Sequence, residues 1–128
     1  MNRTLNRILY VEDDQDIQAI TTMVLKGIHG FILEACSSGN EAMHKAVTFK
    51  PDLILLDVMM PGIDGPATFV ELRKFPSLEL TPVVFMTAKV QPEEVQGYLN
   101  LGAAGVIAKP FDPMTLADQL RDIWTRAR

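Results

Sequence analysis

The stretch Asp52-Leu53-Ile54-Leu55-Leu56-Asp57, followed by Val58-Met59-Met60-Pro61-Gly62, decides the fold. Leu53 to Leu56 form a continuous apolar run that is too short for a helix, which predicts a strand buried on both faces. Asp57 stands where that strand should end, and Pro61 and Gly62 stop the backbone soon after it. Because ligands of open α/β sheets bind outside the carboxyl ends of the strands, Asp57 is a candidate functional residue. A solvated or helix-capping aspartate is an equally good interpretation of this stretch alone.

The composition is that of one ordinary globular domain, and we expect residues 1–128 to form a single unit. The 48% hydrophobic fraction is enough to build a core without disulfides or a structural metal. A net charge of -4 disfavours nucleic-acid binding, which usually needs a basic face. The single cysteine, Cys36, excludes a disulfide framework, and the distant His29 and His44 lack ligand-like spacing. The absence of an apolar run long enough for a membrane span favours the cytoplasm.

Apolar runs and turn residues alternate regularly along the chain. They predict strands at residues 8–11, 31–33, 53–56, 82–86 and 104–108. Helix starts are indicated by the capping-box sequence Ser38 to Glu41, by Asp64, by Pro92 and by Asp112-Pro113. The expected inward-facing helix positions are Ile17, Ile20, Val24, Met43, Ala46, Val47, Phe69, Val70, Leu72, Val95, Tyr98, Leu99, Leu116, Leu120 and Ile123. Five strands alternating with five helices predict an α/β fold, a five-stranded parallel sheet with helices on both faces, and the flavodoxin-like order 2-1-3-4-5 is the usual one.

Polar residues stand at the ends of four predicted strands: Glu12 and Asp13, Asp57, Thr87, and Lys109. In a parallel sheet these ends share one edge, so the side chains should converge. Two carboxylates about 4 Å apart repel by roughly 4 kcal/mol at an effective dielectric near 20. The cluster should therefore take up protons or hold a cation. An all-oxygen ligand set favours a hard divalent ion such as Mg²⁺ over zinc or copper.

Phosphoryl transfer fits this set of residues. With a metal in place, the carboxylate of Asp57 could attack phosphorus and form an aspartyl phosphate. The ammonium of Lys109 could pair with one phosphoryl oxygen, and the hydroxyl of Thr87 could donate a hydrogen bond to another. The simpler alternative for Lys109 is a purely structural ion pair with the acidic residues.

Four motifs together resemble the receiver domain of bacterial two-component response regulators, of the kind that includes the chemotaxis regulators. They are Val11-Glu12-Asp13-Asp14, Asp57 to Gly65, Thr87-Ala88 and Lys109-Pro110-Phe111, and the resemblance covers nearly the whole chain. It implies that Asp57 accepts a phosphoryl group from a phosphohistidine on a sensor histidine kinase or a histidine phosphotransfer protein. Phosphorylation would then change the binding of a downstream protein.

The resemblance also implies the roles of the neighbouring residues. Glu12, Asp13, Asp57 and the backbone carbonyl of Met59 would bind Mg²⁺, for which Mn²⁺ would be an acceptable substitute. Thr87 and Lys109 would contact the phosphoryl group. Weak self-catalysed phosphorylation and dephosphorylation are expected, and the Lys109-Pro110 peptide bond is expected to be cis.

The chain departs from the family where an aromatic residue on the fifth strand normally takes part in switching, because the matching position is Val106. We therefore expect the signal to leave through the loop after Thr87 and the helix that carries Tyr98. The apolar Met59 should hinder the water that hydrolyses the phosphate, and Lys89 could hold an extra anion. A slowly decaying aspartyl phosphate is the resulting hypothesis.

Three rival interpretations are weaker. A flavodoxin or nucleotide-binding module needs a small-residue phosphate loop after the first strand, where Glu12-Asp13-Asp14 would repel a phosphate. A haloacid-dehalogenase-like phosphatase would need a second aspartate at the position of Met59. A domain that only docks a partner does not need Asp57, Thr87 and Lys109. The sequence leaves open the output, and whether the chain is a stand-alone receiver or part of a longer regulator or hybrid kinase.

Overall fold

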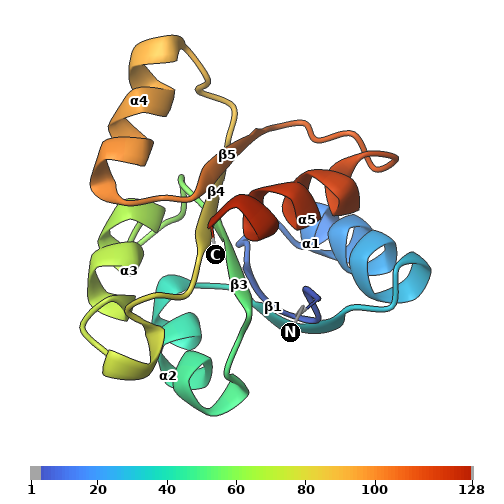
Figure 1. Ribbon diagram of the computed structural model, residues 1–128, viewed down its shortest axis with the longest axis horizontal. Helices are drawn as coiled ribbons and strands as arrows, with labels where there is room; N and C mark the ends of the chain where they lie inside the picture. The colour runs from blue at the N-terminus through green and yellow to red at the C-terminus, as the bar shows by residue number, and fades with distance from the viewer. Residues whose placement is uncertain (1–3, 128) are drawn as a thin grey trace.

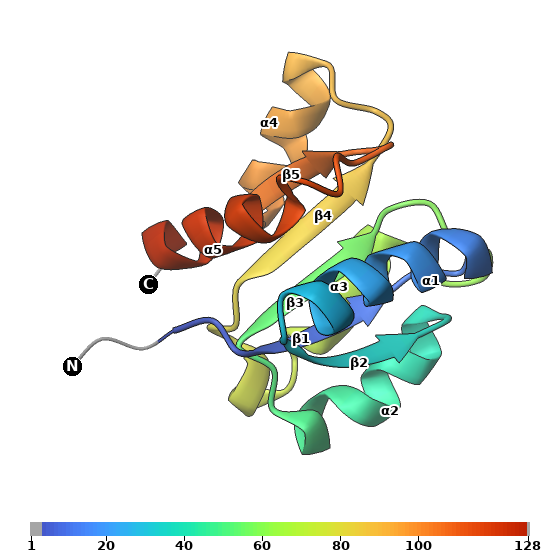
Figure 2. The same ribbon diagram turned by 90° about the vertical axis from the view of Figure 1, so that its right-hand side faces the viewer.

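The protein, described over residues 4–127 by a computed structural model, contains a five-stranded parallel sheet in the order β2-β1-β3-β4-β5. This confirms the predicted fold class and strand order. Figures 1 and 2 show the sheet between two layers of helices. The strands are β1 (Arg7–Val11), β2 (Ile32–Cys36), β3 (Leu53–Asp57), β4 (Val83–Thr87) and β5 (Gly105–Ala108).

The helices divide between the two faces of the sheet. On one face lie α1 (Gln15–Thr22), its π-helical continuation η1 (Met23–Ile28) and α5 (Leu116–Ala127). On the other lie α2 (Gly39–Phe49), α3 (Gly65–Leu72) and α4 (Pro92–Leu101), with the short 3₁₀ segment η2 (Pro76–Leu78) before β4. None of the helices in the described part of the chain is long and apolar enough to cross a membrane.

Strand β3 lies at the centre of the sheet, and all five of its residues are buried. Leu53 and Leu55 pack in the core beneath α1 and α5, whereas Ile54 and Leu56 pack in the core beneath α2 and α3. Burial on both faces is the reason for the continuous apolar run in the sequence. The strand delivers Asp57 to the edge of the sheet where the parallel strands end.

Four helix residues that were expected to face inward are exposed instead. Ile20, Val47, Val70 and Leu99 have exposed fractions of 47%, 39%, 46% and 39%. The fully buried positions nearby include polar or small residues, namely Thr21, Ala42 and Thr68. The hydroxyl groups of Thr21 and Thr68 donate to the carbonyl oxygens four residues earlier, so these side chains enter the core without an unpaired polar group. Small side chains there also let the helices approach the sheet closely.

The edge strand β2 was predicted at residues 31–33 but runs from Ile32 to Cys36. The last helix also differs, because Trp124 is buried and its indole Nε1 donates to the carbonyl of Asp52 at 3.1 Å, while Ile123 is only partly buried. Helix α5 begins at Leu116, after a turn in which Asp112 accepts from the backbone N–H of Met114, and so later than Pro113.

The helix caps largely follow the sequence. Asp64 caps α3 by accepting from the N–H of Ala67 at 2.9 Å. Ser38 caps α2 by accepting from the N–H of Glu41, but the carboxylate of Glu41 accepts from Ser37 rather than closing a reciprocal box with Ser38. Short polar side chains therefore cap both the helix that precedes β3 in the chain, α2, and the helix that follows it, α3.

Candidate functional site

Three carboxylates meet beyond the ends of β1 and β3. The register pairs Val11 with Leu56, so the next residues, Glu12 and Asp57, lie beside each other. Carboxylate oxygens of Glu12, Asp13 and Asp57 all lie within 4.8 Å of one another. Glu12 and Asp57 are buried, with exposed fractions of 0% and 3%. The parallel topology thus produces the acidic cluster that the strand ends predicted.

Lys109 brings a positive charge to this cluster from the end of β5. Its Nζ lies 3.0 Å from Oδ1 of Asp57 and 3.0 Å from Oε1 of Glu12. Its backbone N–H donates to the carbonyl of Thr87 at 2.9 Å, which fixes the base of the side chain. The Lys109-Pro110 peptide bond is cis, as expected. One ammonium cannot neutralise three carboxylates, so an excess of negative charge remains.

The electrostatics of Asp57 and Lys109 follow from this arrangement. Burial, together with the neighbouring Glu12, raises the pKa of Asp57 from 3.8 to about 7, and Lys109 only partly opposes the shift. Burial by itself would lower the pKa of Lys109, but its contacts with Asp57 and Glu12 raise it above the ordinary value. Lys109 is therefore a permanent cation, whereas the carboxylates carry more charge than the site accommodates alone.

Thr87 ends β4, the strand next to β3, and is buried. Its Oγ1 accepts a hydrogen bond from the backbone N–H of Lys89 at 3.0 Å. The hydroxyl is therefore engaged with the loop that follows β4. A movement of Thr87 towards a group on Asp57 would break this bond and release the backbone of the same loop.

The loop after β3 shapes the other side of the site. Gly65 approaches the backbone of Asp57 and Val58 so closely that a Cβ there would lie 2.8 Å from Cα of Val58 and would also collide with the carbonyl oxygen of Asp57. The N–H of Gly65 donates to the carbonyl of Val58 at 2.8 Å. Met59 is 64% exposed, so its side chain lies in solvent two residues from Asp57. Lys89, in the loop after β4, is also exposed.

Tyr10 and Thr21 are parts of the site that sequence reasoning missed, because Tyr10 looked like an ordinary residue of an apolar strand. The phenolic oxygen of Tyr10 lies 3.4 Å from Oε1 of Glu12 and 3.0 Å from Oγ1 of Thr21. Burial raises the pKa of Tyr10 well above its usual range, so the phenol keeps its proton. The available signal was spacing, since residues two apart in a strand point to the same face.

The residues of the cluster fit a hard divalent cation. The side-chain donors are all carboxylate oxygens, which are the ligands that Mg²⁺ prefers. Lys109 brings one positive charge to three carboxylates, and burial together with Glu12 keeps the pKa of Asp57 raised in spite of it. A cation among them would supply the missing positive charge.

Three aromatic rings lie in tilted contact on the α3 and α4 side of the sheet. The ring centroid of Phe85 on β4 lies 5.3 Å from that of Tyr98 on α4 and 5.8 Å from that of Phe69 on α3. Tyr98 is half-buried, as is Val106 on β5. The ring of Tyr98 thus connects α4 to the strand that ends in Thr87.

Comparisons with known proteins point to one family. The family model for the response regulator receiver domain matches residues 8–121. The chain is 36% identical over 121 residues to the DNA-binding response regulator MtrA of Mycobacterium tuberculosis, covering 94% of this chain and 51% of that protein. It is 40% identical over 125 residues to the transcriptional activator protein IrlR of Burkholderia pseudomallei, covering 95% and 52%. The chain thus spans about half the length of the curated relatives it matches.

Among solved structures, the chemotaxis response regulator CheY4 of Vibrio cholerae superposes with a TM-score of 0.86 at 31% identity, covering 94% of this chain and 99% of that one. The receiver domain of a signal transduction histidine kinase from Syntrophus aciditrophicus superposes with a TM-score of 0.81 at 31% identity, covering 94% and 91%. Both likenesses extend over almost the whole described chain.

Proposed function

This chain belongs to the family of response regulator receiver domains, and from that premise we propose that Asp57 is its phosphoryl acceptor. Acceptance of a phosphoryl group in two-component signalling is the function of the family. We also propose that residues 1–128 act as one receiver unit. The observation that carries the proposal is the position of Nζ of Lys109, 3.0 Å from both Asp57 and Glu12 at the carboxyl edge of the sheet.

The transfer itself needs one bond to form and one to break. A carboxylate oxygen of Asp57 bonds to phosphorus while the phosphorus–nitrogen bond of a donor phosphohistidine breaks, and the imidazole nitrogen keeps the electron pair and takes up a proton. Lys109 then pairs with a phosphoryl oxygen in place of Asp57. Thr87 releases the N–H of Lys89 and donates its hydroxyl to another phosphoryl oxygen.

Receiver domains bind Mg²⁺ at an acidic pocket, and in this chain Glu12, Asp13, Asp57 and the carbonyl of Met59 would hold it. When bound, the ion supplies positive charge against the carboxylates and the transferred group. Mn²⁺ suits the same oxygen ligands and would replace it. The fit rests on the crowding of three carboxylates, of which two, Glu12 and Asp57, contact Lys109.

Receiver domains are phosphorylated by sensor histidine kinases, and we propose such a kinase, or a histidine phosphotransfer protein, as the donor. An apolar cavity of about 210 Å³ beside Lys109 supports this choice, because a donor must bring its phosphohistidine next to that residue. Ile17, Ile20 and Phe111 help to line the cavity, and Ile20 is 47% exposed. Apolar side chains of a donor helix would fit there.

The output is proposed to run through protein contacts of the loop after β4 and of α4. Movement of Thr87 would release the N–H of Lys89 in that loop, and Tyr98 packs against Phe85 of the same strand. MtrA is named as a DNA-binding response regulator and IrlR as a transcriptional activator, and this chain matches about half of each. DNA binding is therefore not assigned to these residues.

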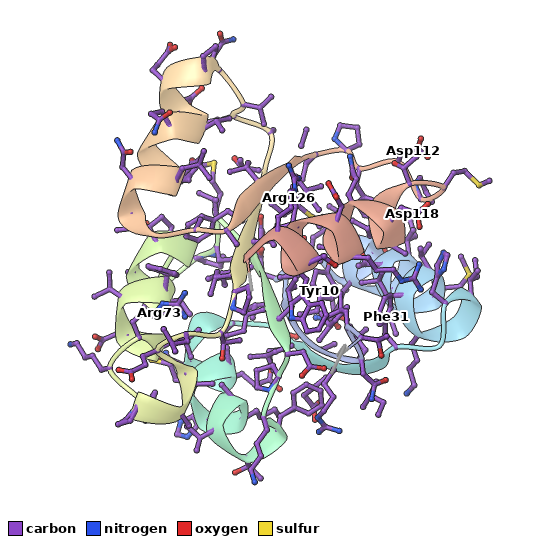
Figure 3. All side chains as sticks on the ribbon, viewed as in Figure 1. Tyr10, Phe31, Arg73, Asp112, Asp118 and Arg126 are labelled. Carbon is purple, nitrogen blue, oxygen red and sulfur yellow. The ribbon has the colours of Figure 1, made fainter. Side chains whose placement is uncertain are left out.

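The proposal is tested with the purified chain, MgCl₂ and acetyl phosphate, followed by intact-protein mass spectrometry. The wild type should gain one phosphoryl group, and Asp57→Asn should gain none. Asp118→Asn is a matched control, because this carboxylate lies on α5 and its side chain is 81% exposed (Figure 3). A wild type that stays unlabelled, or an Asp57→Asn variant labelled like the wild type, would contradict the assignment.

A further inference from the structure

A buried pair of hydroxyl groups lies directly next to the acidic cluster, on the side of the sheet covered by α1 and α5. Tyr10 lies on β1 and Glu12 directly follows the last residue of that strand, so their side chains, two residues apart, point to the same face. Tyr10 has no exposed surface and belongs to the core cluster that also contains residues of α5. Figure 3 shows it in the interior of the molecule. Thr21 reaches it from α1 and is also fully buried.

One hydroxyl proton of this pair, that of Tyr10, is left for two oxygen acceptors, Oγ1 of Thr21 and Oε1 of Glu12. Thr21 donates its own hydroxyl proton to the carbonyl of Ile17 at 2.7 Å, so its Oγ1 is an acceptor towards Tyr10. The phenol of Tyr10 lies 3.0 Å from that Oγ1 and 3.4 Å from Oε1 of Glu12. Because a phenol has a single proton, Thr21 and Glu12 compete for it.

The hydroxyl of Tyr10 matters most to Glu12 once a phosphoryl group is present at Asp57. Its Oε1 contacts Lys109 at 3.0 Å and Tyr10 at 3.4 Å, and its Oε2 accepts from the N–H of Asp14 at 3.3 Å. In the proposed reaction Lys109 turns to a phosphoryl oxygen. The hydroxyl of Tyr10, at 3.4 Å, then remains beside Oε1 of Glu12 as a hydrogen-bond donor.

We propose that Tyr10 is a positioning residue for the cation site, which orients the carboxylate of Glu12 through its O–H group, and that Thr21 moderates this effect by competing for the same proton. This inference rests on the proposed function, since it takes Glu12 to be a metal ligand. Outer residues that hydrogen-bond a metal ligand typically change metal affinity by about 10–100-fold when they are removed. The contact between Tyr10 and Glu12 is long, so the lower end of that range applies.

The test measures Mg²⁺ affinity by isothermal titration calorimetry on the folded chain. Tyr10→Phe keeps the ring and removes only the hydroxyl, and it should weaken Mg²⁺ binding by about tenfold. Thr21→Val keeps the shape and removes the competing acceptor, so it should leave Mg²⁺ binding unchanged or tighter. Tyr98→Phe is the matched control, because it removes the chain's other tyrosine hydroxyl from α4. Urea unfolding in EDTA reports on the fold separately from the metal site.

The outcomes separate this inference from the proposed function. A Tyr10→Phe variant that binds Mg²⁺ within twofold of a binding-competent wild type would overturn the inference alone. A Thr21→Val variant that binds Mg²⁺ about tenfold more weakly than the wild type would also overturn it, and this arm stands even when Tyr10→Phe does not fold. A wild type that binds no Mg²⁺ would overturn the inference together with the proposed metal site.

Discussion

Replacing Asp57 with asparagine should stabilise the metal-free protein at neutral pH, although it removes an ion pair. At an effective dielectric near 20, the attraction to Lys109 at 3.0 Å is about 5–6 kcal/mol, whereas each repulsion between carboxylates up to 4.8 Å apart is about 3.5 kcal/mol or more. The two repulsions therefore exceed the one attraction, and burial adds a dehydration cost. Asparagine keeps the shape of the side chain and removes the charge.

The pKa of Asp57 sets the pH window and the magnitude. Burial and Glu12 raise it from 3.8 to about 7, so between these values the folded protein binds more protons than the unfolded chain. Stability should therefore fall as the pH rises from about 4 to about 7. At 1.36 kcal/mol for each pH unit, the penalty above pH 7 is at most roughly 4 kcal/mol. Because asparagine also loses the ion pair with Lys109, the expected gain in Asp57→Asn is smaller, about 1–3 kcal/mol.

The measurement is urea unfolding in EDTA, followed by the fluorescence of the buried Trp124, the only tryptophan in the chain. Near pH 7.5 the midpoint of Asp57→Asn should lie above that of the wild type, and near pH 4 the two midpoints should nearly coincide. Saturating Mg²⁺ should stabilise the wild type more than the variant. The control Asp118→Asn should stay within about 0.5 kcal/mol of the wild type. A variant less stable than the wild type in EDTA at neutral pH would refute the view that this cluster carries excess negative charge.

Four further predictions address the surroundings of the site. Met59→Asn should speed the decay of the aspartyl phosphate several-fold, followed by mass spectrometry after removal of the phosphodonor; an unchanged lifetime would count against a shielding role. Gly65→Ala should destabilise the fold by about 1–3 kcal/mol in urea unfolding, because its Cβ would meet Val58. Ile20→Glu should slow transfer from a phosphohistidine donor but not from acetyl phosphate, and equal slowing of both would argue against docking at the cavity beside α1. Crystal structures with and without beryllofluoride should differ in the loop after β4 and in α4, and an unmoved α4 would end the proposed route for the signal.

The sequence predicted the centre of this fold well and its periphery less well. The apolar run before Asp57 identifies a strand buried on both faces, and its position at the centre of the sheet confirms this. Edge strands lack such a run, and β2, with Ile32 44% exposed and Glu34 in its middle, was placed too early and made too short. Hydropathy also misplaced Ile20, because the inward side of α1 carries Thr21, whose hydroxyl is paired within the helix.

The side chains of the candidate site could be brought together from sequence because their convergence depends only on the parallel direction of the strands. Their charge balance and hydrogen bonds could not, because these depend on distances of a few ångströms between residues far apart in the chain. Lys109 contacts both Glu12 and Asp57, and Tyr10 touches Glu12 from the core. Spacing in the sequence places Tyr10 and Glu12 on one face, but it does not give the distances between these side chains.

The same arrangement links the stability of the chain to its chemistry. The apolar core around β3 holds three carboxylates close together against their mutual repulsion, with Lys109 as partial compensation. A cation that binds the folded chain and not the unfolded one must then add stability, in proportion to the logarithm of its concentration above its Kd. Transfer of a phosphoryl group to Asp57 replaces one carboxylate with a group of greater negative charge. That group attracts Lys109 and the cation more strongly than the carboxylate does. Phosphorylation of Asp57 should therefore raise the affinity for the cation, and a bound cation should favour phosphorylation. Both effects arise because the cation balances the same excess of negative charge at one edge of the sheet.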